Sequence, residues 1–386
     1  MAGRGPAPAV AKNIPAANAR RVVDVTGLYV TPGLIDIHAH AGVDRPASGL
    51  SYPANMNFSS GLTTIVDAGT WGARDFPEIK RTIIDPAQIR VLSFLNIVAA
   101  GMGSEKEQDI REMDAELCAA TIKKYRDVIV GIKTAHYWTS LPWDATHPPW
   151  ASVDRAIEAG TLADVPVMVD FWPRPPERPY EDLILKKMRP GDIHTHVFAQ
   201  QFPVLLENGK INPIYAEARR RGVIFDVGHG GGSFWFRNAV PAVKQGFIPD
   251  SISTDLHMGS VNGPVVDMIT TMSKMMAIGI PLEDIIRRST VNPAKEIRRP
   301  ELGTLSVGRE ADIAVIELRR GKFSYIDCGR AKMTGDVKLE NRMTLRAGRV
   351  VYDPTGISMV EWSKAPKQYF MSPKKQSDPP STAEPK

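Results

Sequence analysis

Cysteine is scarce in this sequence, and long apolar runs are missing from it. Cys118 and Cys328 are the two cysteines among 386 residues, which excludes a disulfide framework or a cysteine-based metal site and fits a reducing compartment. No run of 18 apolar residues occurs, so we expect no membrane span. Residues 1–21 also lack the apolar core of a signal peptide. We therefore expect a cytoplasmic protein, unless the chain as given begins downstream of an export signal.

Charge of one sign is not in large excess either. The chain has 48 basic and 43 acidic residues, largely interspersed, and a net charge of +5. No basic stripe with interleaved aromatic residues is present, so a nucleic-acid partner is not expected. The hydrophobic content of 43% is ordinary for a globular protein. A chain of 386 residues suffices for one large domain or two smaller ones.

Short apolar, β-branched runs recur along the first two thirds of the chain, and helix-like segments separate them. We expect strands over residues 34–40, 63–69, 91–99, 127–135, 165–171, 192–198, 223–230 and 251–257. Strands that alternate with helices predict βαβ units and a parallel sheet. Eight such units over roughly 250 residues are typical of a (β/α)8 TIM barrel. A doubly wound open sheet has a similar periodicity and stays open as the alternative.

After residue 290 the pattern changes. Residues 303–318 and 343–353 look like short strands joined by glycine turns, without helices between them. They predict a small β domain packed beside the barrel. From about Ser363 the tail is rich in proline, lysine and serine, and we expect it to be disordered.

Two histidines stand one residue apart at the end of the first predicted strand. In "LIDIHAH", His38 and His40 point to the same face of the strand, because side chains alternate with a period of two. Paired imidazoles on a rigid strand can bind one divalent cation. The alternative is a pair of ordinary polar residues where the strand meets water.

Other strands carry polar residues at the same carboxyl-terminal end, where a parallel barrel builds its active site. Lys133 lies in the apolar run "IVGIK", either paired with a carboxylate or carboxylated so that two oxygens bridge two metal ions. "HTH" supplies His194 and His196, and "STDLH" supplies Asp255. An aspartate at a strand end can also cap the following helix. As a set, these groups offer nitrogen and oxygen ligands suited to Zn²⁺ or a similar metal.

With these motifs in one order, the chain resembles the amidohydrolase superfamily. More narrowly, it is similar to the amidohydrolase/deacetylase metallohydrolases, relatives of dihydroorotases and D-aminoacylases. The resemblance runs from about Val22 to Asp353 and rests on "PGLIDIHAH", "IVGIK", "GDIHTHVF", "DVGHGGGSF", "SISTDLH" and "VGREADIAV". It implies a (β/α)8 barrel over residues 32–300 and a small β-sandwich formed by both chain ends. Residues 1–31 would be the N-terminal part of that sandwich, residues 301–353 its return, and residues 354–386 the tail.

The resemblance also implies roles for individual residues. His38 and His40 would hold the more buried metal with Asp255, a carboxylated Lys133 would bridge, and His196 would bind a second metal. His229 in "GHGGGS" would face the substrate; otherwise it is a histidine of a glycine-rich turn.

The sequence departs from the family pattern on the fifth predicted strand and at the N-terminus. Where the family has a histidine, "VPVMVDF" places Asp170. A carboxylate at this position would favour the binding of oxygen-preferring metals such as Mn²⁺. Alternatively, the second metal is weakly bound or absent. His194, on the same strand face as His196, would partly compensate from deeper in the barrel. The N-terminal part of the sandwich looks incomplete, so the start of the chain is an open question.

The implied activity is metal-dependent hydrolysis of an amide bond, of the N-acyl or deacetylase type, or of an acyl ester bond. A metal-activated hydroxide would attack, and Asp255 would act as general base. The cofactor would be one or two divalent ions, Zn²⁺ with Mn²⁺ as the alternative, and the partner a small-molecule substrate. A homo-oligomer is compatible with the sequence.

Other functions stay open. One alternative is a cyclic amidohydrolase such as a dihydroorotase, although Gly42 stands where that enzyme carries an arginine. A deaminase with a single metal would lack Lys133. Another alternative is a catalytically inactive binding protein, which Asp170 and the short β domain favour. Aromatic and arginine side chains in three loops, residues 136–143, 171–180 and 233–238, either bind substrate or pack at the barrel rim.

Overall fold

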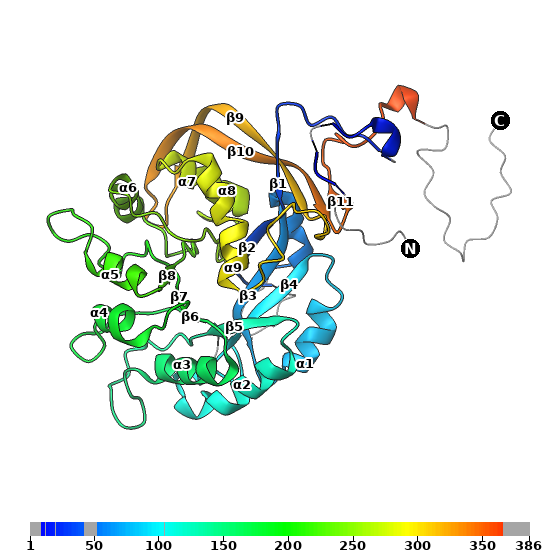
Figure 1. Cartoon of the computed structure of the whole chain (residues 1–386). Helices are drawn as coiled ribbons and strands as arrows, with labels where there is room; N and C mark the ends of the chain where they lie inside the picture. Colours follow the sequence, from blue (N-terminus) through cyan, green and yellow to red (C-terminus); the bar gives the residue numbers. More distant parts are fainter. Residues whose placement is uncertain (1–8, 12, 20, 42–51, 104, 366–386) are drawn as a thin grey trace.

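A parallel sheet curls around the centre of the molecule (Figure 1). The computed structural model describes residues 9–11, 13–19, 21–41, 52–103 and 105–365. The sheet has seven strands in sequence order: β2 (Leu34–Ala39), β3 (Leu62–Gly72), β4 (Arg90–Asn96), β5 (Ile129–Lys133), β6 (Val167–Val169), β7 (Ile193–His194) and β8 (Ile224–Phe225). All six neighbouring pairs are parallel.

An eighth extended segment closes the ring between β8 and β2. Residues 251–256 make parallel bridges from Ser251 to Asp226 and from Leu256 to Ala39. Backbone hydrogen bonds support both, such as His229 N to Ser253 O at 3.2 Å and His40 N to Leu256 O at 3.0 Å. The structure therefore confirms the predicted (β/α)8 barrel, although this eighth segment pairs too irregularly to form a continuous strand.

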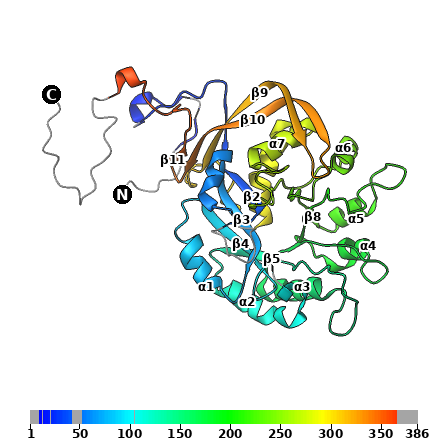
Figure 2. The same cartoon turned by 180° about the vertical axis from the view of Figure 1, so that it is seen from behind.

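Helices cover the outside of the sheet, as the two opposite views show (Figures 1 and 2). They are α1 (Phe76–Ile79), α2 (Ala115–Lys124), α3 (Ala151–Ala163), α4 (Tyr180–Asp182), α5 (Ile214–Arg220), α6 (Phe236–Lys244), α7 (Met268–Ala277), α8 (Leu282–Arg288) and α9 (Val291–Glu296). Short 3-10 and π turns are η1 (Ala16–Asn18), η2 (Ala54–Ser60), η3 (Lys80–Ile84), η4 (Glu105–Gln108), η5 (Ile110–Glu112), η6 (Leu183–Lys187) and η7 (Trp362–Lys364).

The apolar runs of the sequence become strands because they are buried on both faces, as a parallel barrel requires. Every residue of β2 and β3 is buried. Outward side chains join the large core beneath the helices, whereas inward ones form a smaller core. Ala294 and Ile297, in and just after α9, belong to that inner core and fill the barrel next to the start of β2.

A second sheet, antiparallel, is built from both ends of the chain in the order β1-β9-β10-β11. Its strands are β1 (Tyr29–Pro32), β9 (Ile313–Ile326), β10 (Lys332–Arg346) and β11 (Arg349–Tyr352). The contribution of both ends was predicted. The prediction of short strands was wrong for β9 and β10, which have 14 and 15 residues. They form a hairpin that passes over α7, where Leu339 N donates to Ser273 Oγ at 2.9 Å.

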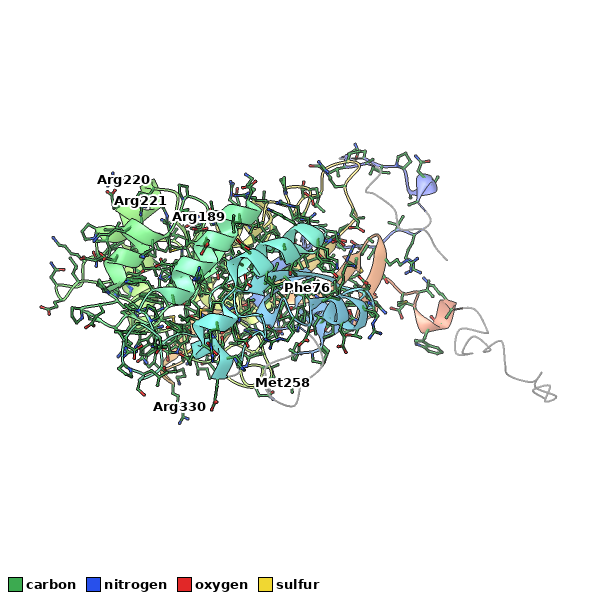
Figure 3. The ribbon with its side chains drawn as sticks, turned by 90° about the horizontal axis from the view of Figure 1, so that it is seen from below. Phe76, Arg189, Arg220, Arg221, Met258 and Arg330 are labelled. Carbon is green, nitrogen blue, oxygen red and sulfur yellow. The ribbon has the colours of Figure 1, made fainter. Side chains whose placement is uncertain are left out.

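The tip of this hairpin reaches the mouth of the barrel. Seen from below, Arg330 at the tip and Met258 beyond the eighth segment lie on one side of the molecule, while Arg189, Arg220 and Arg221 lie on the other (Figure 3). The tip therefore sits beside the loops that follow the strands.

Two further expectations concern the tail and membrane-spanning helices. Residues 366–386 of the predicted disordered tail lie outside the described residues. Among the described residues, no helix combines the length and apolar character needed to cross a membrane.

Candidate metal centre

His38, His40 and Asp255 form a compact cluster at the barrel mouth. His40 Nε2 lies 3.0 Å from Asp255 Oδ1, and His38 Nε2 lies 3.6 Å from the same oxygen. One ligand atom from each residue lies within 4.8 Å of the other two. Both histidines are buried, and the Asp255 side chain is 15% exposed. The structure thus brings together the three residues expected to hold the more buried metal.

The side chain of Thr195 orients the His38 ring. Thr195 Oγ1 donates to Asp226 Oδ2 at 2.8 Å and lies 2.7 Å from His38 Nδ1. Because the hydroxyl proton is used toward Asp226, the oxygen is free to accept the Nδ1 proton of His38. That tautomer leaves the Nε2 lone pair of His38 pointing at the cluster, as in metal-binding histidines held by a second hydrogen bond.

His40 and His196 are held in the same way. His40 Nδ1 lies 2.7 Å from Thr70 Oγ1, and His196 Nδ1 lies 2.5 Å from the carbonyl oxygen of Gly228. A carbonyl can only accept, so His196 carries its proton on Nδ1 and presents Nε2 as a lone pair. The Thr70 hydroxyl can donate or accept at His40 Nδ1, so it holds the His40 ring without fixing its tautomer. All three rings nevertheless point Nε2 toward the cluster, which is the arrangement a divalent cation needs.

A second group of donors adjoins the first. Lys133 Nζ, at the end of β5, lies 3.3 Å from His38 Nε2 and 3.6 Å from Asp170 Oδ2. His196 Nε2 lies 3.4 Å from the same Asp170 oxygen, and the rings of His38 and His196 are 4.8 Å apart. Lys133, Asp170 and His196 are all buried. The residues expected at the second metal position thus lie side by side.

Two of these residues have an uncommon backbone. Asp255 has φ 49° and His196 has φ 61°, in the left-handed region that costs a non-glycine residue energy. Gly230 approaches Asp255 so closely that a Cβ atom there would lie 2.4 Å from Asp255 Oδ2. Strained backbone of this kind gathers at functional sites, where it aims side chains.

The electrostatics favour a neutral His38 beside ionised carboxylates, whereas burial of His196 is outweighed by the Asp170 carboxylate, which raises the pKa of the His196 ring. Burial and the neighbouring Lys133 amine hold the pKa of His38 well below its usual range, so the ring is neutral at pH 7. Burial raises the pKa of Asp255, but the imidazoles of His38 and His40 outweigh it and lower the pKa overall. For Asp170, burial is likewise outweighed by His196 and Lys133, and the pKa lies well below its usual range. These are the protonation states in which imidazole and carboxylate bind a cation.

His229 is fully buried, and both of its ring nitrogens are engaged. Nδ1 lies 3.0 Å from Gly230 O, and Nε2 lies 3.0 Å from Lys274 Nζ. The ring stacks on Phe234 with centroids 4.6 Å apart. A role in substrate binding therefore stays a prediction for His229, because a substrate would have to displace one of these contacts.

His194 does not share a face with His196, so that expectation was wrong. Its ring packs among Tyr180, Phe202 and Phe225, with centroids 4.6 to 5.8 Å away, and no described residue bonds to its nitrogens. The alternation fails because β7 ends at His194 and the positive φ of His196 turns that side chain inward beside Thr195.

The arginines of the rim loops are already used within those loops. Arg174 stacks 4.0 Å from the Trp143 ring and donates to the carbonyls of Thr139 and Leu141. Arg178 is buried, donates to Tyr137 O and lies 4.3 Å from the Phe171 ring. These contacts favour packing at the rim for Arg174, whereas Nε and Nη2 of Arg178 are buried without a hydrogen-bond partner among the described residues. Gly42, the position that argued against a dihydroorotase, lies outside the described residues.

Sequence reasoning missed several residues that support the site. Thr195 sets the tautomer of His38, Asp226 holds Thr195, and Thr70 holds the His40 ring at Nδ1. His136, three residues after Lys133, lies 3.1 Å from Asp170 Oδ2 through its Nε2. One signal was available: Asp226 is a charged residue inside the apolar run "VIFDV". His136 gave no signal, because it lies in a loop beyond the strand.

Comparisons with known proteins agree with this geometry. The amidohydrolase family profile matches residues 236–351. A deacetylase of Brucella anthropi is 32% identical over 330 residues, covering 83% of this chain and 78% of the relative. A deacetylase of Enterococcus faecalis is 30% identical over 331 residues, covering 85% of this chain and 87% of the relative.

Solved structures show the same likeness. A crystal structure of an adenine deaminase has 28% identity and a TM-score of 0.75, covering 85% of this chain and 88% of its own. A crystal structure of a dihydroorotase has 29% identity and a TM-score of 0.73, covering 83% of this chain and 85% of its own.

Proposed function

This chain belongs to the amidohydrolase family, and from that premise we propose that it removes an acyl group from a small molecule. The bond cleaved is an N-acyl amide, as the deacetylase names of its relatives suggest, or an acyl ester. The observation that carries the proposal is the convergence of His38, His40 and Asp255 beside Lys133 and His196.

The donor set fits a divalent ion, Zn²⁺ or Mn²⁺. His38, His40 and Asp255 would hold one ion, and Lys133, Asp170 and His196 would serve a second position. Imidazole nitrogens suit Zn²⁺, whereas the additional carboxylate of Asp170 also suits Mn²⁺. When bound, such an ion lowers the pKa of a coordinated water from 15.7 toward ~7 and polarises the carbonyl to be cleaved.

Asp255 is the proposed general base and acid. Its Oδ1 is held by His40 Nε2 at 3.0 Å, and its 15% exposure leaves the carboxylate within reach of a substrate. The Asp255 carboxylate would accept the proton of the attacking water and then deliver it to the leaving amine or alkoxide. Thr195 would keep His38 in the tautomer that leaves Nε2 free, and Thr70 would hold the His40 ring in place.

The test is hydrolysis by the metal-loaded chain of a panel of N-acetyl amino acids and acetylated hydroxy acids. We expect turnover that a chelator abolishes and that added Zn²⁺ or Mn²⁺ restores. Asp255→Asn should lower kcat by about 10²- to 10⁴-fold, the usual contribution of a general acid–base. Asp85→Asn, an exposed carboxylate on the outer surface, serves as the control. A metal-loaded chain that hydrolyses no member of the panel, or an Asp255→Asn variant with wild-type kcat, would overturn the proposal.

A further inference from the structure

His136 is a polar residue of the site that the expected metal ligands do not include. Its Nε2 lies 3.1 Å from Asp170 Oδ2, the same oxygen that lies 3.4 Å from His196 Nε2 and 3.6 Å from Lys133 Nζ. The side chain is 33% exposed, so it stands at the open edge of an otherwise buried group. Three nitrogens from three different strands or loops thus surround one carboxylate oxygen.

We propose that His136 is a ligand of a second divalent cation, which it holds together with Asp170 and His196. The inference rests on the proposed function, because the second ion would belong to the same hydrolytic site. In this arrangement, the loop after β5 supplies the imidazole that Asp170 does not provide at the end of β6.

Two of the three separations match those of a metal site. In tetrahedral coordination with bonds of about 2.0–2.1 Å, neighbouring ligand atoms lie roughly 3.3–3.4 Å apart. The two Nε2 atoms lie 3.1 and 3.4 Å from Asp170 Oδ2. Among the described residues, His38, His40 and Asp255 are the group whose ligand atoms all lie within 4.8 Å of one another, so a cation held by Asp170, His136 and His196 requires the partly exposed His136 ring to move toward His196.

The main chain of His136 is anchored on both sides. Its N–H donates to Glu107 Oε1 at 3.0 Å, and its carbonyl oxygen accepts from Gln108 Nε2 at 2.6 Å. Glu107 Oε2 also lies 3.7 Å from His136 Nδ1. This buried carboxylate lies behind the far ring nitrogen, as carboxylates do behind many metal-binding histidines, although the distance exceeds that of a hydrogen bond.

Metal stoichiometry tests this proposal independently of turnover. Each variant is loaded with excess Zn²⁺ or Mn²⁺ in bicarbonate buffer, desalted and analysed by elemental mass spectrometry. We expect two ions per wild-type chain and one ion for His136→Ala. His147→Phe is the matched control, since His147 lies in the same loop but stacks on Trp143 instead of facing Asp170. It should keep two ions.

Two further variants separate ligation from a structural role. Glu107→Gln should weaken binding of the second ion about 10- to 100-fold while the first stays bound. Asp170→His in the His136→Ala background returns an imidazole beside His196 and should restore the second ion. A double variant that still holds one ion would count against the proposal.

The outcomes also distinguish this inference from the proposed function. A wild-type chain that saturates with one ion yet hydrolyses the acyl panel overturns the second site and leaves the activity intact. So does a His136→Ala variant that keeps both ions. Conversely, two ions in the wild type and one in His136→Ala, with no hydrolysis of the panel, support the site and overturn the activity.

Discussion

At the scale of single residues, the hydroxyl group of Thr195 decides which nitrogen of His38 is available. Thr195 links His38 to the buried carboxylate of Asp226. The Thr195 methyl group and backbone contribute nothing to this link. The hydroxyl can therefore be removed with little change in volume.

Thr195→Val tests this link. Without the hydroxyl, the proton of His38 is no longer held on Nδ1, and we expect metal affinity to fall about 10- to 100-fold. Competition with a chromogenic chelator measures the change. Thr121→Val, in which the lost hydroxyl bonded only a carbonyl within α2, is the control and should keep wild-type affinity. Equal affinities for the two variants would contradict the role of Thr195.

Lys274 gives a second prediction at this scale, one of stability against pH. Burial lowers the pKa of Lys274 from 10.5 to about 8. Between these values the unfolded chain binds more protons than the folded chain, so the free energy of unfolding rises with pH across this window. The stability gained from the deprotonation of Lys274 is complete above pH 10.5, the pKa in the unfolded chain. It is lost as the pH falls through about 8, the pKa in the folded chain.

Lys274→Met should remove this dependence. The wild-type free energy of unfolding should gain up to about 3 kcal/mol between pH 8 and pH 10.5 relative to the variant. Urea titrations at several pH values measure it, with the exposed Lys210→Met as control. Parallel curves for wild type and Lys274→Met across the window would show that Lys274 does not titrate in this way.

At the scale of elements, the strands place the site by close packing as well as by pairing. Gly69, within β3, has φ 83°, and a Cβ atom there would lie 2.6 Å from Lys133 Cβ. Lys133 therefore reaches its position against a bare glycine backbone on the next but one strand. A side chain at position 69 would push the β5 lysine away from His38.

We expect Gly69→Ala to lower the free energy of unfolding by about 3 kcal/mol, from the left-handed backbone and the clash together. It should also reduce the metal bound per chain by displacing Lys133. Gly246→Ala is the matched control, because Gly246 has φ 86° with no atom within 4 Å of a Cβ. Its cost should be about 1 kcal/mol, with metal content unchanged. Similar losses for both variants would mean that contact with Lys133 has no effect.

A second arrangement of elements joins the β9–β10 hairpin to the loop that carries His229. Cys328 N donates to Phe234 O at 3.0 Å, and Phe236 N donates to Asp327 Oδ2 at 3.0 Å. The antiparallel sheet thus holds the loop after β8, although its own strands start at the opposite end of the barrel. This explains why β9 and β10 are longer than the short strands expected.

At the scale of the whole molecule, one buried carboxylate joins the two sheets. Asp312 precedes β9 and accepts from Arg90 Nη1 of β4 at 2.9 Å, from Arg346 Nη1 of β10 at 3.1 Å and from Ala347 N at 2.8 Å. Glu310 pairs with the same two arginines. The barrel and the antiparallel sheet are therefore tied together by charges and by β1 leading directly into β2.

Asp312→Ala should lower the free energy of unfolding by about 1 to 3 kcal/mol, because it leaves the Ala347 N–H without its acceptor and two half-buried arginines with Glu310 alone. Glu283→Ala, which breaks an exposed pair with Arg287, should cost less than about 1 kcal/mol. Chemical denaturation followed by tryptophan fluorescence measures both. A loss below 1 kcal/mol for Asp312→Ala would show that this junction adds little.

The sequence alone determined the barrel, the sheet built from both chain ends, and the strand ends that carry His38, His40, Lys133 and Asp255. It did so because buried parallel strands are apolar runs, and polar residues at their carboxyl ends stand out. Spacing along a strand also predicts which side chains share a face. Burial of a strand and the alternation of its side chains depend on neighbouring residues, so the order of residues in the sequence shows them.

The tertiary structure decided the rest. It separated His194 from His196, since a positive φ breaks the alternation that the spacing predicted. It brought Thr195, Asp226 and His136 to the site through contacts between segments that are far apart in the sequence. Hydrogen bonds and charge contacts between distant segments depend on where the backbone turns. A sequence pattern does not encode those turns.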